Sequence, residues 1–155
     1  MNIGSVSSGY HFISFMAAEK PISEPPSPHN SRAAATATKP IVSGVDGLAI
    51  GIGTTIHLHC DLTFATPGSL FRTPFTDLGL VPEAASSLIV PQIMGHQRAF
   101  AMLGMGEGFS AQQAREAGLI WKVVGADALE AEVMTAAEAL AAKPPEALQL
   151  AKKLV

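Results

Sequence analysis

Residues 41–53 read IVSGVDGLAIGIG, a series of short apolar segments separated by glycines. The run Ile41-Val42-Ser43-Gly44-Val45 is short and mostly apolar, which is typical of a buried strand, and Asp46-Gly47 is a turn signal at its end. A second apolar step, Leu48-Ala49-Ile50, leads into a corner bracketed by glycines, Gly51-Ile52-Gly53. We expect a strand, a turn and a second step of strand here, with a helix that starts at the corner.

The rest of the chain alternates helix and strand signals, which favours an α/β fold over a sandwich or a helical bundle. Ser110 with Gln113 fits a capping box and Gly118 fits a helix stop, while Asp127 with Glu130 repeats the capping pattern. The expected elements are a helix over residues 54–60, a strand over 62–65, a strand over 119–124, a helix ending near Lys143 and a last helix from Pro145.

The composition changes upstream of the core. Residues 19–40 contain five of the eleven prolines, with Ser, Ala and Thr between them, which is typical of a loop. We therefore divide the chain into residues 1–18, a loop over 19–40, and a core over 41–155 that includes the start of a helical C-terminal region. Residues 154–155 are still apolar without a stop signal, so we expect the chain to end inside an element.

Composition and charge exclude several classes of protein. A chain of 155 residues, 48% of them hydrophobic, is long and apolar enough for one globular domain. The net charge of -3 leaves no basic field for a nucleic acid, and no apolar run is long enough to span a membrane. Cys60 is the one cysteine and cannot form an internal disulfide, and residues 1–18 contain no Lys or Arg for a targeting signal. We expect a cytoplasmic protein.

Three neighbouring side chains, His57, His59 and Cys60, have the chemistry of metal ligands. Residues two apart do not share a helix face, so the histidines lack the spacing of a zinc pair, and we interpret them as packing residues. Cys60 has no basic neighbour to lower its pKa and is interpreted as a small buried hydrophobe. The corner at residues 51–53 is not followed by the Lys-Ser/Thr of a phosphate loop, which argues against nucleotide hydrolysis. No metal site is predicted.

Glu83 is the one acid between Asp77 and Glu107, and it stands in an apolar stretch, residues 78–85. Residues 82–84 look like the start of a helix. If this stretch is buried, desolvation raises the pKa of Glu83 and makes it a plausible proton carrier near neutral pH. The alternative is an exposed first-turn glutamate that the helix dipole stabilises. The residues alone leave both interpretations open.

Residues 42–53, followed by the LHCDL segment at 58–62, resemble the signature of the enoyl-CoA hydratase/isomerase (crotonase) family. The apolar strand, the Asp-Gly turn, the triplet and the closing Cys-Asp all fall at that family's spacing. The resemblance continues to Val155 through residues 71–75, 78–83, 94–95, 109–114 and 117–120. It implies an α/β fold, the crotonase-like ββα spiral with a helical C-terminal part, of which this chain would lack the first strands and the final helices.

The resemblance also implies an oxyanion hole made of two backbone N–H groups. Ile52 is the middle residue of the triplet, where the family has Gly or Ala and uses the backbone N–H, so a side-chain change need not remove the donor. Residues 6–11 resemble the family's Ala/Ser-Gly-x-Asp loop, which makes Ser8 the second N–H donor and puts His11 where Asp is expected. Substrate contacts are expected from Gly51, Gly53, Phe75 and Leu80.

The acidic residues distinguish between the reactions of this family. Its hydratases use two glutamates, whose positions fall here on Thr55 and Phe75, and neither side chain can transfer a proton as that reaction requires. Glu83 falls where the isomerase branch has its single catalytic glutamate. The resemblance therefore implies an isomerase that converts 3-enoyl-CoA to 2-enoyl-CoA, with Glu83 moving the proton and the oxyanion hole holding the dienolate.

The implied partners are an acyl-CoA and further copies of the chain in a homotrimer or hexamer, without a nucleic acid or a membrane. No cofactor is implied, because the thioester of the CoA substrate is its own electron sink. Two alternatives remain. One is a truncated, inactive crotonase-family subunit, which His11 and the proline-rich segment motivate; the other is another crotonase chemistry, such as 2-enoyl-CoA hydration, thioester hydrolysis or dehalogenation.

Overall fold

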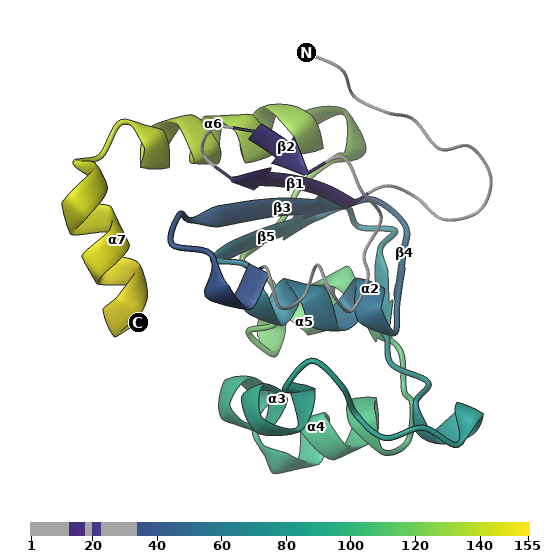
Figure 1. Ribbon diagram of the computed structural model, residues 1–155. Helices are drawn as coiled ribbons and strands as arrows, with labels where there is room; N and C mark the ends of the chain where they lie inside the picture. The colour runs from purple at the N-terminus through teal and green to yellow at the C-terminus, as the bar shows by residue number, and fades with distance from the viewer. Residues whose placement is uncertain (1–12, 18–19, 23–33) are drawn as a thin grey trace.

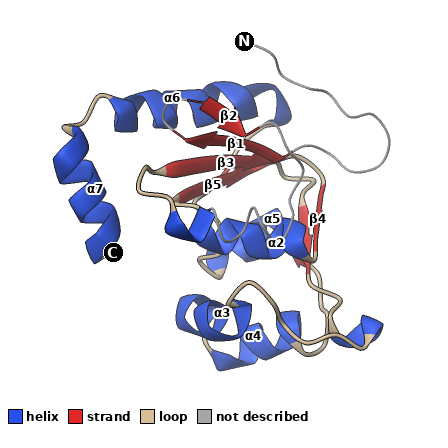
Figure 2. Ribbon diagram, viewed as in Figure 1, coloured by secondary structure: helices blue, strands red, loops and turns tan. Residues whose placement is uncertain are grey.

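The computed structural model describes residues 13–17, 20–22 and 34–155, and in this part of the chain it shows a mixed α/β fold. The larger sheet has the strand order β2-β1-β3-β5-β8 (Figure 2). Strands β3, β5 and β8 are parallel, whereas β1 is antiparallel to β3 and β2 is antiparallel to β1. The strand bounds are β1 Ile13–Ala17, β2 Lys20–Ile22, β3 Ile41–Val45, β5 Leu62–Ala65 and β8 Lys122–Val123.

The predicted strands at residues 41–45 and 62–65 are confirmed as β3 and β5. All five residues of β3 are buried, because β3 is a central strand of this mixed sheet and is covered on both faces. Helix α6 (Leu129–Ala141) packs on β3 and β5, above the sheet in Figure 1. Helix α6 lies very close to β3 at Gly44, where a Cβ atom would lie 3.1 Å from Cγ2 of Val133.

A smaller sheet has the strand order β4-β6-β7, and its first strand follows the Asp46-Gly47 turn. Its strands are β4 Leu48–Ile50, β6 Leu70–Arg72 and β7 Phe109–Ser110. The helix expected over residues 54–60 begins two residues earlier, as α2 (Ile52–Thr55), and continues as the 3-10 helix η1 (Ile56–His59). It begins earlier because Gly51, at a φ of +58°, reverses the chain immediately before Ile52.

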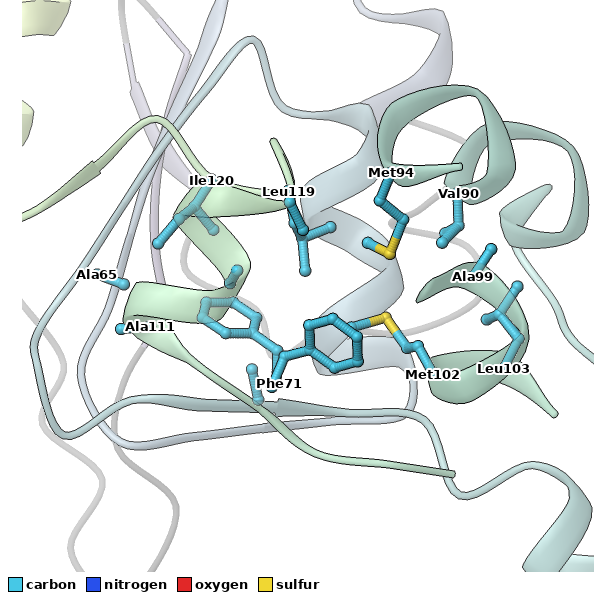
Figure 3. Packing of buried hydrophobic residues seen from close by; sticks show 14 of the residues in the cluster. Ala65, Phe71, Val90, Met94, Ala99, Met102, Leu103, Ala111, Leu119 and Ile120 are labelled. Atoms are coloured by element: carbon cyan, nitrogen blue, oxygen red, sulfur yellow. The ribbon is translucent and has the colours of Figure 1, made fainter. Parts of the chain in front are cut away.

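The main hydrophobic core lies between the sheets and the helices below them. Helices α3 (Ser86–Met94) and α4 (His96–Leu103) form a pair in the lowest layer, and α5 (Ala111–Glu116) lies above them (Figure 1). Figure 3 shows the fully buried Phe71 at the centre of this core. Around it are Ala111, Leu119 and Ile120 on one side and Val90, Met94, Ala99, Met102 and Leu103 of the helix pair on the other.

The helix signals of the C-terminal half are confirmed in part. Ser110 and Gln113 form the predicted capping box, and Gly118 follows the helix at a φ of +81°. The second capping prediction, Asp127 with Glu130, is wrong: Asp127 lies in the 3-10 helix η3 (Ala126–Ala128), and α6 begins without a side-chain cap. The strand predicted over 119–124 is reduced to β8, since Leu119 and Ile120 turn into the core instead of pairing.

The last helix, α7 (Pro145–Leu154), begins at the predicted proline and descends from the end of α6 (Figure 1). Within the segment predicted to be a loop, residues 19–40, the described residues include β2 and a helical turn at residues 34–36. Ala34 of this turn is buried against Ile41 and Ile56. Of the helices described, none combines the length and apolar character that crossing a membrane would take.

Candidate functional site

The glycine-bracketed corner presents backbone N–H groups at the end of strand β4. Gly51 has φ +58° and ψ -119°, and its own N–H donates to the carbonyl of Arg72 at 2.8 Å. Ile52 and Gly53 follow as the first two residues of α2, where a backbone N–H has no acceptor within the helix. Because α2 is only four residues long, its dipole contributes little, and the individual N–H groups are what the corner offers to a negatively charged oxygen.

Thr54 fixes this corner to the two strands beside it. Its buried hydroxyl donates to the carbonyl of Ala49 in β4, and it accepts the backbone N–H of Arg72 in β6 at 3.0 Å. The backbone N–H groups of Thr54 and Thr55 both return to the carbonyl of Gly51, at 2.9 and 3.0 Å. The orientation of the Ile52 N–H is therefore held by two neighbouring strands of the smaller sheet, β4 and β6, and does not depend on the Ile52 side chain.

Glu83 lies on the segment between η2 (Thr76–Leu78) and α3, and its side chain is half-buried. The helix start predicted at residues 82–84 is wrong, because α3 begins at Ser86 after two left-handed residues, Ala84 (φ +51°) and Ala85 (φ +57°). The N–H of Ser86 donates to the carbonyl of Glu83 at 2.9 Å and closes this turn. Glu83 therefore precedes the helix and is not the first-turn residue that the dipole alternative required.

The two left-handed alanines are a local source of strain. A residue with a Cβ atom in this conformation costs roughly 1–2 kcal/mol relative to the right-handed region, and such costs gather at functional sites. The structure around the turn must therefore hold it in place.

The apolar stretch around Glu83 is not buried in the single chain, so the burial considered above is not found. Leu78 is 68% exposed and Val81 is 80% exposed. The stretch is held outward by polar contacts, since Arg72 pairs with Asp77 at 2.9 Å and the hydroxyl of Thr76 donates to the carbonyl of Gly104 at 2.9 Å. Glu83 thus stands beside an open apolar surface.

Phe75 and Leu80 were both expected to contact substrate, and the structure separates them. Phe75 is 5% exposed and packs in the main core, so its ring supports the site from behind. Leu80 is exposed, and its N–H donates to the carbonyl of Phe75 at 2.7 Å. Of the two, only Leu80 has a side chain that is exposed and so accessible to a ligand.

The positions of the two hydratase glutamates contain no proton carrier. Thr55 is buried in α2, and its hydroxyl has no hydrogen-bond partner among the residues that the structure describes. Phe75 is a core aromatic residue, as stated above. Water activation by two acids therefore has no side chains at these positions to perform it.

His59 joins the two halves of the candidate site. It lies at the end of η1, and its Nε2 atom is 2.9 Å from the carbonyl oxygen of Ala84, the residue after Glu83. Sequence reasoning grouped His59 with packing residues and missed this contact. No local pattern could have revealed it, because the two residues are 25 positions apart.

His57 and Cys60, by contrast, are inward-facing. Nδ1 of His57 is 3.1 Å from the hydroxyl of Ser43, and its ring meets Phe71 edge-on, with the centroids 6.0 Å apart. Burial lowers the pKa of His57 from 6.5 to about 4, so the imidazole is neutral near pH 7. Burial raises the pKa of the Cys60 thiol to about 12, against the smaller opposing effect of a hydrogen bond to Ser43. Both residues agree with the packing interpretation.

No three His, Cys, Asp or Glu side chains in the described ranges gather closely enough to hold a metal ion. A shallow hollow of about 520 Å³ includes His57, Cys60, Arg115 and Trp121 in its lining, but not Glu83 or Ile52.

Ser8 and His11, predicted for the second half of the oxyanion hole, lie outside the described residues. The structure thus brings one N–H corner and one carboxylate onto neighbouring segments that His59 connects.

A family model described as Enoyl-CoA hydratase/isomerase matches residues 7–155 of the chain. Over 117 residues the chain is 37% identical to enoyl-CoA delta isomerase 2 of Rattus norvegicus, an alignment that covers 76% of this chain and 30% of that protein. Over 117 residues it is 34% identical to the 1,2-epoxyphenylacetyl-CoA isomerase of Escherichia coli (strain K12), with 76% of this chain and 45% of that protein covered.

Solved structures agree with these matches. The fold is similar to that of an enoyl-CoA hydratase/isomerase from Pseudoalteromonas atlantica T6c, with a TM-score of 0.78 and 41% identity over 80% of this chain and 50% of that one. The predicted crotonase-like α/β fold is thereby confirmed. The chain spans half or less of the length of these three relatives.

Proposed function

The chain belongs to the enoyl-CoA hydratase/isomerase (crotonase) family, and from this membership we propose that it is an acyl-CoA isomerase that converts 3-enoyl-CoA to 2-enoyl-CoA. The observation that supports this reaction most directly is a single carboxylate, Glu83, beside an open apolar surface, on a turn that His59 links to the helical segment that begins at Ile52. Two of the relatives bear the word isomerase in their names, which points in the same direction.

The proposed reaction needs one proton carrier and one site for negative charge. The carboxylate of Glu83 removes a proton from C2 of the 3-enoyl thioester, and the electron pair moves onto the thioester oxygen to give a dienolate. The backbone N–H of Ile52 stabilises that oxygen, together with the N–H of Ser8 as the second donor. The protonated Glu83 then returns the proton at C4, which restores the thioester carbonyl, leaves the double bond between C2 and C3, and regenerates the carboxylate.

The flanking residues have supporting roles in this proposal. Gly51 and Gly53 add no side chain on either side of Ile52, so a thioester can approach the N–H groups closely. Leu80 offers apolar contact to the acyl chain, and Phe75 supports it from the core. We further propose that the substrate is an acyl-CoA, that the chain assembles as a homotrimer or hexamer, and that it acts in the cytoplasm.

One other function is favoured by a specific observation. Apolar side chains beside Glu83 are exposed, as expected of a subunit that another chain covers, and this favours the inactive-subunit alternative. Hydration of 2-enoyl-CoA is less favoured, because Thr55 and Phe75 replace both acids that activate water in the family's hydratases.

The test follows the absorbance of the conjugated thioester when purified protein is given a 3-enoyl-CoA. We expect turnover by the wild type and a loss of about 100- to 10,000-fold in Glu83→Gln, because the variant keeps the shape of the side chain but cannot accept the proton. Glu130→Gln, an exposed position on α6, is the matched control and should retain full activity.

Two results would contradict the proposal. If folded wild-type protein gives no turnover, the inactive-subunit alternative is favoured. If the protein hydrates 2-enoyl-CoA faster than it isomerises 3-enoyl-CoA, the reaction has been assigned wrongly. Circular dichroism of each variant establishes that the comparison is made between folded proteins.

A further inference from the structure

One hydrogen bond crosses between η1, the helical turn that continues from the N–H corner through α2, and the Glu83 segment. Nε2 of His59 lies 2.9 Å from the carbonyl oxygen of Ala84. Because a carbonyl oxygen can only accept, Nε2 must carry a hydrogen and donate it. His59 is therefore a donor in this contact, and its function can be tested by replacing it with a side chain that donates or with one that does not.

The accepting carbonyl lies at the centre of the turn that follows Glu83. It belongs to the peptide group that joins Ala84 to Ala85, the two residues held at positive φ. On its far side the turn is closed by the N–H of Ser86 donating to the carbonyl of Glu83. The His59 bond therefore fixes the plane of a strained peptide group, and with it the direction in which the chain leaves Glu83.

The donor end of the bond is equally well fixed. His59 follows α2 directly through η1, and the next N–H, that of Cys60, donates back to the carbonyl of His57 at 3.2 Å. The chain then enters β5, which pairs with the central strand β3. His59 thus belongs to the same rigid segment as the Ile52 N–H corner.

We infer that His59 is a positioning residue, which holds the Glu83 turn at a set distance from the N–H corner so that the carboxylate and the oxyanion donor act on the same thioester. This inference rests on the proposed function above. It assigns no proton transfer to His59 itself. Proton transfer and charge stabilisation require their groups to be held within a fraction of an ångström, and a contact between their two supporting segments provides that constraint.

The first experiment measures kcat and KM for three histidine variants in the isomerisation assay. We expect His59→Leu to lower kcat by about 10- to 100-fold with KM unchanged, since the substrate surface remains while the carboxylate is displaced. His59→Gln keeps an N–H donor at a similar reach and should retain most of the activity. His96→Leu, which removes an exposed histidine of α4, is the matched control and should behave as the wild type.

The second experiment measures hydrogen exchange at the amide of Ser86, which closes the turn. We expect faster exchange in His59→Leu than in the wild type and no change in His59→Gln or His96→Leu. This readout does not depend on turnover, so it tests the contact even in a protein that lacks isomerase activity.

The outcomes separate the two proposals. Full activity and unchanged Ser86 exchange in His59→Leu, beside an inactive Glu83→Gln, would overturn the inference and leave the proposed function intact. Equal losses in His59→Leu and His59→Gln would also overturn it, because the donor would then be irrelevant. An inactive wild type would overturn the proposed function and with it any catalytic role of His59, while Ser86 exchange would still show whether His59 holds the turn.

Discussion

His57 and His59 stand two residues apart in one short helix and differ completely in environment. His57 is buried against Ser43 and Phe71, whereas His59 reaches out to the carbonyl of Ala84. In a helix, residues two apart point to different faces, so the same residue type serves the core in one position and the candidate site in the other. At the scale of single residues, environment and not identity decides what each histidine does.

The buried His57 makes the stability of the protein dependent on pH. Its pKa is about 4 in the folded chain and 6.5 in the unfolded one, so below pH 6.5 the unfolded state binds the additional proton. Stability from this group is complete above pH 6.5 and is lost as the pH falls towards 4, by about 3 kcal/mol in total. Urea unfolding at several pH values between 7 and 4 measures this.

A His57→Gln variant provides the comparison. Its side chain does not titrate and can still bond to Ser43, so the decrease in unfolding free energy between pH 6.5 and 4 should be smaller than in the wild type by about the amount given above. The exposed His96→Leu variant should keep the wild-type slope. If the unfolding free energy of the wild type and of His57→Gln depends on pH in the same way, His57 takes up its proton over the same pH range in the folded chain as in the unfolded chain.

Several elements of the fold are too short to be stable alone or are held by few contacts. Helix α2 has four residues and β8 has two. Helix α7 contains no buried residue, and Lys152 connects it to the rest of the protein. The ammonium group of Lys152 lies 2.7 Å from Oδ2 of Asp61 and 2.9 Å from the carbonyl of Lys39. The same carboxylate oxygen of Asp61 accepts the N–H of Ile41.

Removing the Lys152 link should therefore release α7 without unfolding the sheet. We expect Lys152→Met to cost about 1 kcal/mol or less, since the ion pair is only partly shielded from water, and to increase amide exchange within α7 selectively. Lys153→Met, at the exposed neighbouring position, is the control. Equal exchange in both variants would show that the ion pair does not hold the helix.

At the scale of the whole molecule, the sheet separates two hydrophobic clusters. Phe71 and the helix pair α3 and α4 form the larger cluster below it, and Phe64, Val133 and Ala137 belong to the smaller cluster on the side of α6. Gly44 sets the spacing on the upper side, because a Cβ atom there would lie 3.1 Å from Val133 and 3.4 Å from Leu129. The distance between β3 and α6 thus depends on the absence of a side chain at Gly44, and not on an unusual backbone conformation of this glycine.

Gly44→Ala should lower the unfolding free energy of the entire fold by about 1–3 kcal/mol, since Val133 is buried and has little room to move away. Gly68→Ala is the matched control, because a Cβ atom at Gly68 meets nothing within 4 Å. Thermal and urea unfolding of both variants measure the difference. A Gly44→Ala variant as stable as Gly68→Ala would show that α6 moves freely on the sheet.

The prediction of the fold from sequence succeeded where local signals were strong. The apolar run at residues 41–45, the capping box at Ser110 and the proline before α7 act over a few residues, and each predicted element is present. The predictions failed where distant contacts overrode the local pattern. Asp127 does not cap α6, and residues 119–124 contribute only two residues to the sheet because Leu119 and Ile120 enter the core.

For the candidate site, the sequence by itself determined which candidate groups are present: one carboxylate at Glu83, a glycine-bracketed corner at Ile52, and no acid at the positions of Thr55 and Phe75. Tertiary structure alone decided that Glu83 precedes its helix on two left-handed alanines, that the stretch around it faces solvent, and that His59 ties it to the corner. The physical reason is the separation along the chain of the residues that determine each property. Residue type and backbone turns are properties of a few adjacent positions, whereas exposure and hydrogen bonds between segments 25 residues apart exist only after the chain has packed.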